Sequence, residues 1–453
     1  MIHVTANSKE VRPGSIFFAL QGAKFDGHDF IDDAIRAGAS TIYSERDLGR
    51  PDVIPLGDQA RKKLGELASE MYGHPTQNLV MIGVTGTSGK TTTSYLIEHL
   101  LNECGSDLHL RCARIGTNGA HFDGKLASTI NTTPDAISLQ KWFKEVLDQG
   151  ATHVVMEVSS HALQQDRVWG IAWDAAVFLN LSPEHLDYHP TLDQYFEAKA
   201  RLFTDHFDFS KQQGKHPRLF ANVDNEYGRR LVQEQPQVEA YSPQGTDPNS
   251  IQCPLFGAFQ LENILAALQV VKALVVPLGV PSDRVVKALS SFPGVPGRME
   301  AIANMRGIHV FVDYAHKPEA LEKVLSSIQG KRIITVFGCG GDRDKTKRPV
   351  MGAIAARLSD ELILTSDNPR TEDPLVILGE IEAGVKLALE NHSAKIASYR
   401  VIADRAEAIR AAVALAHAGD LVLIAGKGHE TYQIFGSEKR HFDDREEARK
   451  ALA

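Results

Sequence analysis

The stretch IGVTGTSGKTTTSYL, Ile82–Leu96, constrains the fold more than any other part of the sequence. An apolar run, a glycine turn and an amphipathic run predict a buried strand, a tight loop and a helix. Such a loop binds nucleotide phosphate through backbone N–H groups, with Lys90 adding positive charge and the Thr91 hydroxyl available to Mg²⁺. A glycine-rich turn with a solvated lysine is the plain alternative, and Val84 stands where the strict P-loop pattern has glycine. The strand-loop-helix context favours the nucleotide site.

Apolar runs and helical periodicity alternate along the rest of the chain. The runs NLVMIGV, THVVMEV and AAVFLNL predict a mainly parallel sheet around the P-loop. After the loop PGVPGRME, a new series predicts a Rossmann-like domain: IHVFVDYAH, RIITVFGCGG, ELILTSDNP and DLVLIAGKG. We therefore predict an α/β fold of three domains: a small α/β domain at 1–79, a central nucleotide-binding P-loop domain with a mainly parallel sheet at 80–298 and a Rossmann-like domain at 299–453.

Composition limits the class of protein. The 453 residues exceed one ordinary core, and Asp plus Glu outnumber Lys plus Arg by 57 to 49, with no basic run that would follow a nucleic-acid backbone. The four cysteines form no CxxC pair, and the N-terminus lacks the apolar segment of a signal peptide. No uninterrupted run of about 18 apolar residues occurs. We expect a cytoplasmic protein that binds neither nucleic acid nor membrane.

Two single residues have both a plain and a chemical interpretation. Glu157 ends the strand predicted in HVVMEV, where a carboxylate can hold Mg²⁺, although a strand-end glutamate is more often a cap or a surface charge. Lys199 lies in the predicted helical stretch DQYFEAKARLF among apolar residues, where a lysine usually extends to solvent. Neither residue alone decides the chemistry.

Ten motifs in a fixed order resemble the Mur ligases, and most closely the MurE type, which adds the third residue of the peptidoglycan stem peptide. They are GTSGKTT, NTTPD, MEVSSHAL, NLSPEHLDYH, YFEAKARLF, GRME, DYAHKPEAL, FGCGGDRDKTKRP, DNPRTEDP and AGKGHE. The resemblance runs from about residue 5 to residue 445. It implies a UDP-binding N-terminal domain, a central ATP-binding ligase domain and a C-terminal amino-acid-binding domain.

The implied reaction joins an amine to the γ-carboxylate of D-Glu in UDP-N-acetylmuramoyl-L-Ala-D-Glu. ATP phosphorylates the carboxylate, and the amine attacks the resulting acyl phosphate. Lys199 corresponds to a lysine that CO₂ converts to a carbamate, N6-carboxylysine. The implied Mg²⁺ ligands are Thr91, Glu157, His185 and the Lys199 carbamate. The implied catalytic residues are Lys90, Glu157, His185 and Lys199.

The same resemblance assigns the substrate sites. The implied ATP-binding residues are Gly86, Thr87, Ser88, Gly89, Lys90, Thr91, Thr92, Asn263, Arg298, Asp313 and His316. The implied residues for the UDP-muramoyl dipeptide are Ser8, Asn131, Thr132, Thr133, Ser159, Gln165 and Arg167. Relatives commonly have Asp-Ser-Arg where this chain has Asn7-Ser8-Lys9, and a second asparagine where it has Gln260.

The motif DNPR implies meso-diaminopimelate as the amine. An arginine can clamp the distal carboxylate of this substrate at two points, and lysine has no such carboxylate. The implied pocket residues are Arg343, Asp367, Asn368, Pro369, Arg370, Gly426 and Glu430, with Glu430 suited to the distal ammonium. Taken alone, DNPR would be an ordinary turn.

Several other functions remain open at this stage. The nearest is the same ligase using L-lysine or another diamino acid. Folylpolyglutamate synthase is a further ligase, but DNPR and MEVSSHAL fit it poorly. A nucleotide switch or hydrolase would need a guanine motif or a water-positioning glutamine, and the sequence shows neither. A non-enzymatic scaffold is disfavoured because ligand-type residues are predicted at strand ends in all three domains. We expect a monomer acting on small-molecule substrates.

Overall fold

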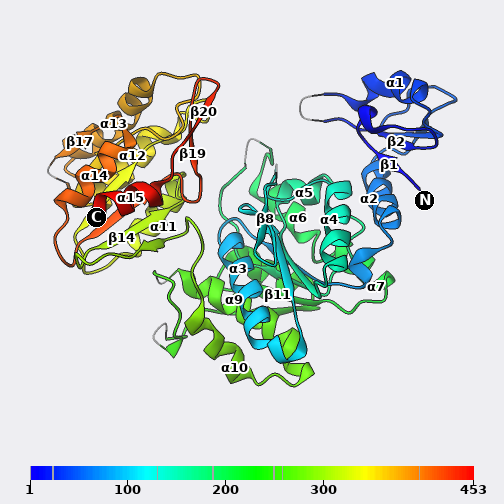
Figure 1. Cartoon of the computed structure of the whole chain (residues 1–453), viewed down its shortest axis with the longest axis horizontal. Helices are drawn as coiled ribbons and strands as arrows, with labels where there is room; N and C mark the ends of the chain where they lie inside the picture. Colours follow the sequence, from blue (N-terminus) through cyan, green and yellow to red (C-terminus); the bar gives the residue numbers. More distant parts are fainter. Residues whose placement is uncertain are drawn as a thin grey trace. The chain divides into compact units, whose positions relative to one another are not determined.

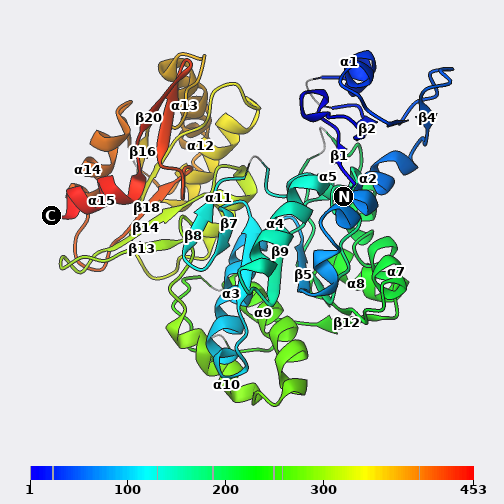
Figure 2. The ribbon, with the colours of Figure 1, turned by 45° about the vertical axis from the view of Figure 1, so that its right-hand side comes forward.

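The computed structural model describes residues 2–22, 25–129, 131–185, 188–247, 250–257, 259–396 and 398–453. The chain forms two compact units (Figures 1 and 2). The first is Met1–Cys253 with Leu261–Phe292, and the second is Pro254–Gln260 with Pro293–Ala453. The domain boundaries at residues 79 and 298 remain predictions.

The N-terminal segment forms a four-stranded parallel sheet in the order β1-β2-β3-β4. Its strands are β1 (Val4–Thr5), β2 (Ile16–Ala19), β3 (Thr41–Ser44) and β4 (Ile54–Pro55). Its helices are η1 (Ser8–Glu10), η2 (Gly27–Phe30) and α1 (Ile31–Arg36). The strand β2 lies in GSIFFALQG and the helix α1 in DFIDDAIRAGAS, so the segment has the α/β character predicted for it. Gly38 follows this helix with φ 92°, a conformation that glycine adopts without strain.

The helix α2 (Gln59–Met71) packs on the central segment through a close backbone contact. A Cβ on Gly65 would lie 2.5 Å from the carbonyl oxygen of Trp169, and a Cβ on Gly170 would lie 2.4 Å from that of Gly65. The indole Nε1 of Trp169 also donates to Glu66 Oε1 at 3.3 Å. Both glycines are therefore required for α2 to lie this close.

The central sheet has eight strands in the order β12-β11-β10-β5-β9-β6-β7-β8. The pairs β6–β7 and β7–β8 are antiparallel and the others are parallel. The strands are β5 (Val80–Thr85), β6 (Cys112–Gly116), β7 (Gly119–Phe122), β8 (Lys125–Ala127), β9 (His153–Glu157), β10 (Ala175–Phe178), β11 (Arg218–Asn222) and β12 (Val238–Tyr241). The mainly parallel sheet and the position of Glu157 at a strand end are both confirmed.

Helices before, between and after these strands complete the first unit. They are η3 (Pro75–Gln77), α3 (Lys90–Cys104), η4 (Ser106–Leu108), α4 (Ala136–Asp148), α5 (Ser160–Gln164), α6 (Leu192–Ala200), α7 (Asp205–Gln212), α8 (Glu226–Glu234), α9 (Gln260–Val275), η6 (Val276–Leu278), α10 (Ser282–Lys287) and η7 (Ala288–Ser291). The predicted helix through DQYFEAKARLF is shorter than expected and ends at Ala200, because Leu202 and Phe203 turn into the buried core.

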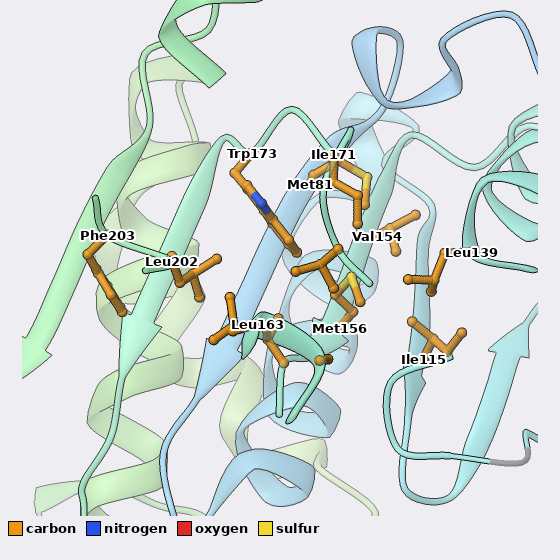
Figure 3. Close-up of a cluster of buried hydrophobic side chains, with 14 of the residues drawn as sticks. Met81, Ile115, Leu139, Val154, Met156, Leu163, Ile171, Trp173, Leu202 and Phe203 are labelled. Carbon is orange, nitrogen blue, oxygen red and sulfur yellow. The ribbon is translucent and has the colours of Figure 1, made fainter. Parts of the chain in front are cut away.

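The core of the first unit surrounds one tryptophan (Figure 3). Trp173 is 1% exposed and packs with Met81, Met156 and other apolar side chains. A Cβ on Gly83, in the middle of β5, would lie 3.1 Å from the Trp173 ring and 3.2 Å from Leu202 Cδ2. Glycine thus leaves room in the strand for the indole, which offsets its low strand propensity.

The C-terminal unit contains a six-stranded sheet in the order β13-β14-β18-β15-β16-β17, parallel except for β13. Its strands are β13 (Glu300–Ile302), β14 (His309–Asp313), β15 (Ile333–Phe337), β16 (Glu361–Leu364), β17 (Tyr399–Val401) and β18 (Leu421–Ala425). A hairpin of β19 (Tyr432–Phe435) and β20 (Glu438–His441) follows. All four strands predicted from the apolar runs of this unit are confirmed.

Two helical layers cover this sheet (Figures 1 and 2). The helices are α11 (Pro318–Ser326), α12 (Lys347–Leu358), α13 (Pro374–Glu390), α14 (Arg405–Leu415) and α15 (Asp444–Leu452). Alternate residues of β18 enter different cores, since Leu423 packs in the cluster with α11, α12 and α13 while Val422 and Ile424 pack in the cluster with α14 and α15. This alternation is the expected period of a strand buried on both faces.

One helical segment, Gln260–Leu278, passes a length and composition test for a membrane span, with mean hydropathy 1.6. Polar residues interrupt it, including Glu262 and Lys272. Ala266 and Val270 are fully buried in the protein. The test is weak support for a span, because the core helix of a soluble protein passes it as well.

A buried histidine offers a test of the energetics of this fold. His206 is fully buried against Trp169, and neither ring nitrogen has a hydrogen-bond partner within the described chain. Burial lowers its pKa from 6.5 to about 3, so the native protein resists protonation at this site. We predict that His206→Leu raises the free energy of unfolding by about 1 kcal/mol at pH 7, because two unsatisfied polar atoms are removed.

The difference in free energy of unfolding between His206→Leu and the unmodified protein should increase as the pH falls below 6.5, by up to about 1.4 kcal/mol per pH unit. In the unmodified protein the unfolded chain then binds a proton that native His206 does not. Urea unfolding at pH 7 and pH 5 measures both effects. His216→Leu, at an exposed histidine, is the matched control. A destabilised His206→Leu protein at both pH values would contradict the prediction.

Candidate active site

The predicted phosphate loop lies between β5 and α3, where two glycines permit close packing. Gly86 has φ 151° and Gly89 has φ 88°. A Cβ on Gly86 would lie 2.9 Å from Leu179 Cβ, and a Cβ on Gly89 would lie 2.1 Å from Asn263 Oδ1. The structure thus brings Asn263, which the sequence also assigned to ATP, against this loop. The start of a helix favours anions through its first backbone N–H groups and its dipole, so the position of this loop before α3 fits the predicted phosphate site.

Two lysines converge on one carbonyl of this loop. Lys90 Nζ donates to the oxygens of Gly86 at 2.9 Å and Thr87 at 2.8 Å, and Lys199 Nζ donates to Gly86 at 2.9 Å. Lys199 is only 1% exposed. Burial, and then the charge of Lys90, hold the pKa of Lys199 well below its usual value. This lysine therefore favours the uncharged amine, the form that reacts as a nucleophile.

The carboxylate of Glu157 accepts three hydrogen bonds at the same edge of the sheet. Thr91 Oγ1 donates to Oε2 at 3.0 Å, and Thr117 donates its N–H to Oε1 at 2.9 Å and its Oγ1 to Oε2 at 3.0 Å. A Cβ on Gly116 would lie 2.1 Å from Oε1, so only glycine fits there. The hydroxyl of Thr91 and the carboxylate are oxygen ligands of the type that Mg²⁺ prefers, so this pair fits the predicted metal.

His185 and Lys199 are linked to the loop through Tyr195. The hydroxyls of Tyr195 and Thr87 lie 3.3 Å apart, and Lys199 Nζ lies 4.7 Å from the centroid of the Tyr195 ring. The ring centroids of His185 and Tyr195 are 6.1 Å apart. Within the described ranges, no three His, Cys, Asp or Glu side chains form a group that could hold a metal. The ligand set predicted from the resemblance stays a prediction.

Four residues assigned to the UDP-muramoyl dipeptide form one connected cluster. Thr133 Oγ1 donates to the Glu157 carbonyl at 2.8 Å and accepts the Ser159 N–H at 3.2 Å. Arg167 Nη1 donates to the Thr133 carbonyl at 3.2 Å, and its Nε donates to Gln165 Oε1 at 2.9 Å. The cluster therefore reaches the backbone of Glu157.

The remaining three residues of this assignment differ in position. The hydroxyls of Thr132 and Thr117 lie 3.3 Å apart, which places Thr132 beside the Glu157 carboxylate. Asn131 is exposed in the same turn. Ser8 lies on η1 and makes none of these contacts. Asn7, the departure from the common motif, caps η1 by accepting the Lys9 N–H.

In the second unit, the residues assigned to ATP meet at the end of β14. Asp313 accepts the N–H of Met299 at 2.7 Å and that of Ala315 at 2.8 Å, and burial raises its pKa. The guanidinium of Arg298 lies 4.6 Å from the centroid of the Tyr314 ring. Burial lowers the pKa of His316. The structure therefore brings Arg298 and His316 to the same strand end as Asp313.

The residues assigned to the amine also gather at strand ends. Asn368 Nδ2 donates to Glu430 Oε2 at 2.9 Å. A Cβ on Gly426 would lie 2.9 Å from Asp367 Oδ2, and the Gly426 N–H donates to the carbonyl of Asp313 at 3.0 Å. The amine residues therefore connect directly to the end of β14.

The two arginines assigned to the amine both lie close to Gly340. A Cβ on Gly340 would lie 2.9 Å from Arg370 Nη1 and 3.8 Å from Arg343 Cγ. Arg370 has φ 53°, and its Nη1 donates to the Gly341 carbonyl at 2.7 Å. Pro369 precedes it and is buried. Arg343 is exposed. Each guanidinium donates to a carbonyl of the loop after β15, Arg343 to Asp342 at 3.3 Å and Arg370 to Gly341 at 2.7 Å.

Comparison with known proteins assigns the family. Residues 2–68 match the Mur ligase family, catalytic domain; residues 84–247 match the Mur ligase middle domain; and residues 297–428 match the Mur ligase, glutamate ligase domain. The chain belongs to the Mur ligase family. The predicted family and the predicted three-domain α/β fold class are confirmed.

Relatives match this Mur ligase over nearly its whole length. A UDP-N-acetylmuramoyl-L-alanyl-D-glutamate--2,6-diaminopimelate ligase of Geobacter sulfurreducens is 43% identical over 484 residues, covering 98% of this chain and 92% of the relative. A protein of the same name from Geobacillus thermodenitrificans is 40% identical, covering 100% and 95%. A solved structure of that name has a TM-score of 0.68 and 34% identity, covering 100% of this chain and 94% of the other.

More distant structures share the fold. The MurF ligase from Thermotoga maritima in complex with ADP has a TM-score of 0.56 at 23% identity, covering 94% of each chain. A folylpolyglutamate synthase of Mycobacterium tuberculosis has a TM-score of 0.59 at 16% identity, covering 81% of this chain and 92% of the other. The Mur ligase architecture therefore extends beyond the relatives that share its sequence motifs.

Sequence reasoning missed three residues of this Mur ligase. Thr117 directly follows β6, the strand next to β9, so a polar residue at a neighbouring strand end was the available signal. Lys427 lies inside the motif AGKGHE between two assigned residues, and its side chain is fully buried. Arg405 gave no signal, since a charged residue in such a sequence is normally solvated.

Arg405 forms a buried ion pair beneath the amine residues. It pairs at two points with Asp444 of α15, with both N–O distances 2.7 Å and both side chains fully buried. It also donates to the carbonyls of Ala425 at 2.9 Å and Ser366 at 3.4 Å. Asp367 follows one of these carbonyls and Gly426 the other, so the pair braces both strand ends of the pocket.

A cavity of about 570 Å³ lies beside α6. It is lined by Gln164, Tyr188, His189, Pro190, Gln194, Glu197, Ala198 and Arg201. The hydroxyl of Tyr188 accepts from Gln165 Nε2 at 3.0 Å. The cavity therefore adjoins the cluster assigned to the muramoyl dipeptide.

We predict that Gly116→Ala preserves the fold but impairs ATP-dependent turnover. The added Cβ would displace the Glu157 carboxylate from its three donors, so the Mg²⁺ concentration for half-maximal phosphate release should rise by about tenfold or more. Phosphate release across a Mg²⁺ titration, with a melting curve for each protein, measures this effect.

The matched control is Gly379→Ala in α13. A Cβ there meets no atom within 4 Å, so alanine should keep full activity and stabilise the helix by up to about 1 kcal/mol. If folded Gly116→Ala needed the same Mg²⁺ concentration as the unmodified enzyme, the position of the Glu157 carboxylate would not affect Mg²⁺ binding, and the prediction would be wrong.

Proposed function

We propose that this Mur ligase is the ATP-dependent acid–amino-acid ligase, UDP-N-acetylmuramoyl-tripeptide synthetase, that adds meso-diaminopimelate to UDP-N-acetylmuramoyl-L-Ala-D-Glu in peptidoglycan synthesis. The observation that carries the proposal is the 43% identity to a ligase of that name across 98% of the chain. The DNPR residues at their strand ends support the choice of amine. As a cell-wall enzyme it serves cell shape and division.

Activation of the acid explains the need for ATP. A carboxylate repels nucleophiles and has a poor leaving group. Transfer of the γ-phosphoryl group to the D-Glu γ-carboxylate gives an acyl phosphate and ADP. The amine then attacks the acyl carbon, and the tetrahedral intermediate collapses to an amide with loss of inorganic phosphate. Cleavage of ATP to ADP and phosphate thus drives formation of the amide bond.

The P-loop residues hold the nucleotide in this scheme. The loop residues Gly86 to Thr92 surround the phosphates, and Lys90 releases its bonds to the loop carbonyls to neutralise the γ-phosphoryl group. Asn263, Arg298, Asp313 and His316 bind the rest of the nucleotide. Mg²⁺ bound at Thr91, Glu157, His185 and modified Lys199 would screen the charge between nucleotide and acid.

Lys199 is the proposed site of carbamylation. Its uncharged amine adds to CO₂ and loses a proton, which gives a carbamate with two oxygens and a negative charge. Burial favours the free amine that adds to CO₂. The positive charge of the neighbouring Lys90 then stabilises the carbamate anion. The product is an oxygen donor next to the carbonyl that Lys199 now contacts.

The substrate residues divide into two groups. Ser8, Asn131, Thr132, Thr133, Ser159, Gln165 and Arg167 bind the UDP-muramoyl dipeptide. Arg343, Asp367, Asn368, Pro369, Arg370, Gly426 and Glu430 bind the diamino acid, with Arg370 on its distal carboxylate and Glu430 on its distal ammonium. We further propose a soluble cytoplasmic monomer that acts on these small molecules, without nucleic-acid or membrane partners.

Lys199→Ala should lower turnover by about a hundredfold while ATP still binds, because the carbamate anion is lost but the P-loop remains. Acetate should restore part of the activity by entering the space left by the side chain. Turnover with and without acetate, ATP binding by calorimetry, and the carbamate signal in ¹³C NMR under ¹³CO₂ measure these effects. Lys211→Ala, at an exposed lysine, is the control. Full activity in Lys199→Ala would remove the carbamate from the mechanism.

An amine panel tests the substrate. With ATP and the UDP-sugar dipeptide, the enzyme should release phosphate best with meso-diaminopimelate. Arg370→Lys should reduce its preference over L-lysine by about tenfold or more, because an ammonium cannot clamp a carboxylate at two points. Arg357→Lys, at an exposed arginine of the same unit, should keep the preference. Equal or better turnover with L-lysine in the unmodified enzyme would refute the assignment.

A further inference from the structure

Lys427 is a fully buried cation at the centre of the amine pocket. Its Nζ donates to Glu430 Oε2 at 2.9 Å and to Asn368 Oδ1 at 3.3 Å, and it lies 4.0 Å from Asp367 Oδ1. Its side chain is 0% exposed. A lysine is almost never completely buried unless it is paired, and here these three polar neighbours all belong to the assigned pocket, while the Tyr432 ring centroid lies 5.4 Å from Nζ.

These contacts fix the orientation of the Asn368 carboxamide and the Glu430 carboxylate. Asn368 Nδ2 and Lys427 Nζ both donate to Glu430 Oε2, and Asn368 Oδ1 accepts from Lys427 and from the Ile434 N–H at 3.1 Å. The carboxamide of Asn368 therefore has one orientation, and the carboxylate of Glu430 is anchored through one oxygen. Lys427 closes this ring of hydrogen bonds.

Lys427 also balances the charge of the pocket. Asp367 and Glu430 are both acidic, and a carboxylate without a nearby cation is costly to bury. The Lys427 ammonium, within 4.0 Å of an oxygen of each, reduces their mutual repulsion.

We propose that Lys427 is a positioning residue for the amine substrate. It holds Glu430 and Asn368 in the arrangement that receives the distal end of the diamino acid. The inference rests on the proposed function and adds to it a residue that need not touch the substrate. Its effect is therefore confined to binding of the amine.

The experiment compares Lys427→Met, Lys427→Arg, Glu430→Gln and the double variant Lys427→Met/Glu430→Gln. Steady-state kinetics for meso-diaminopimelate, ATP and the UDP-sugar dipeptide, with a melting curve for each protein, provide the measurements. Lys427→Met should raise the KM for the amine by about thirtyfold, with the KM for ATP and for the dipeptide within about twofold of the unmodified enzyme. Lys427→Arg keeps the charge and should show a smaller rise.

The double variant distinguishes positioning from general support of the fold. Because Lys427 acts through Glu430, the double variant should have an amine KM no higher than the worse single variant, rather than the product of the two effects. Multiplicative effects would overturn the proposal. So would an unchanged amine KM in Lys427→Met, or an equal rise in the KM for all three substrates.

Loss of folding in Lys427→Met does not prevent the test. Removing both charges leaves no unpaired Glu430 carboxylate, so the double variant is then compared with Glu430→Gln, and the two amine KM values should agree within about threefold. A further rise of about tenfold would overturn the proposal. If the unmodified enzyme showed no amine-dependent phosphate release, the proposed function itself would fail instead.

Discussion

Parallel pairing of β5, β9 and β10 is the constraint on which the nucleotide site depends. It places the P-loop, Glu157 and Asn180 at one edge of the central sheet, because parallel strands end on the same side. Asn180 then fixes the loop by accepting the N–H groups of Thr87 and Ser88, each at 2.9 Å. The sheet of the second unit does the same for Asp313, Asp367 and Gly426. In both units, the direction of the strands, rather than closeness in sequence, brings these polar residues to one edge of the sheet.

Two buried lysines show how the surroundings decide the chemistry of one side-chain type. Lys199 has a carbonyl and a second lysine as neighbours, and both burial and that charge disfavour its ammonium. Lys427 has Glu430 at 2.9 Å and so forms an ion pair. The first environment favours a reactive amine, and the second favours a fixed cation. Composition and spacing cannot distinguish the two, because both lysines lie in apolar, helix-forming or glycine-rich sequence.

Much of the fold was predictable because strong local patterns agree with it. The apolar runs became strands, and the P-loop glycines are required by positive φ and by contacts such as that of Gly89 with Asn263. Contacts made across the fold were not predictable. Thr117 reaches Glu157 only because β6 pairs with β9, and the helix containing Lys199 ends early because residues after it enter the core. The resemblance, rather than the residues alone, supplied the role of Lys199 and the ligand set.

The ion pair of Arg405 with Asp444 connects α15 to the strand ends that carry the proposed amine residues. Proteolytic trimming before residue 444 would remove the carboxylate that pairs with the Arg405 guanidinium, which donates to the carbonyls of Ser366 and Ala425. The carboxyl-terminal helix is thus no dispensable tail. Shortened expression products that end before α15 would lack this ion pair. They would therefore be poor samples for inhibitor screening, even where the first unit still folds.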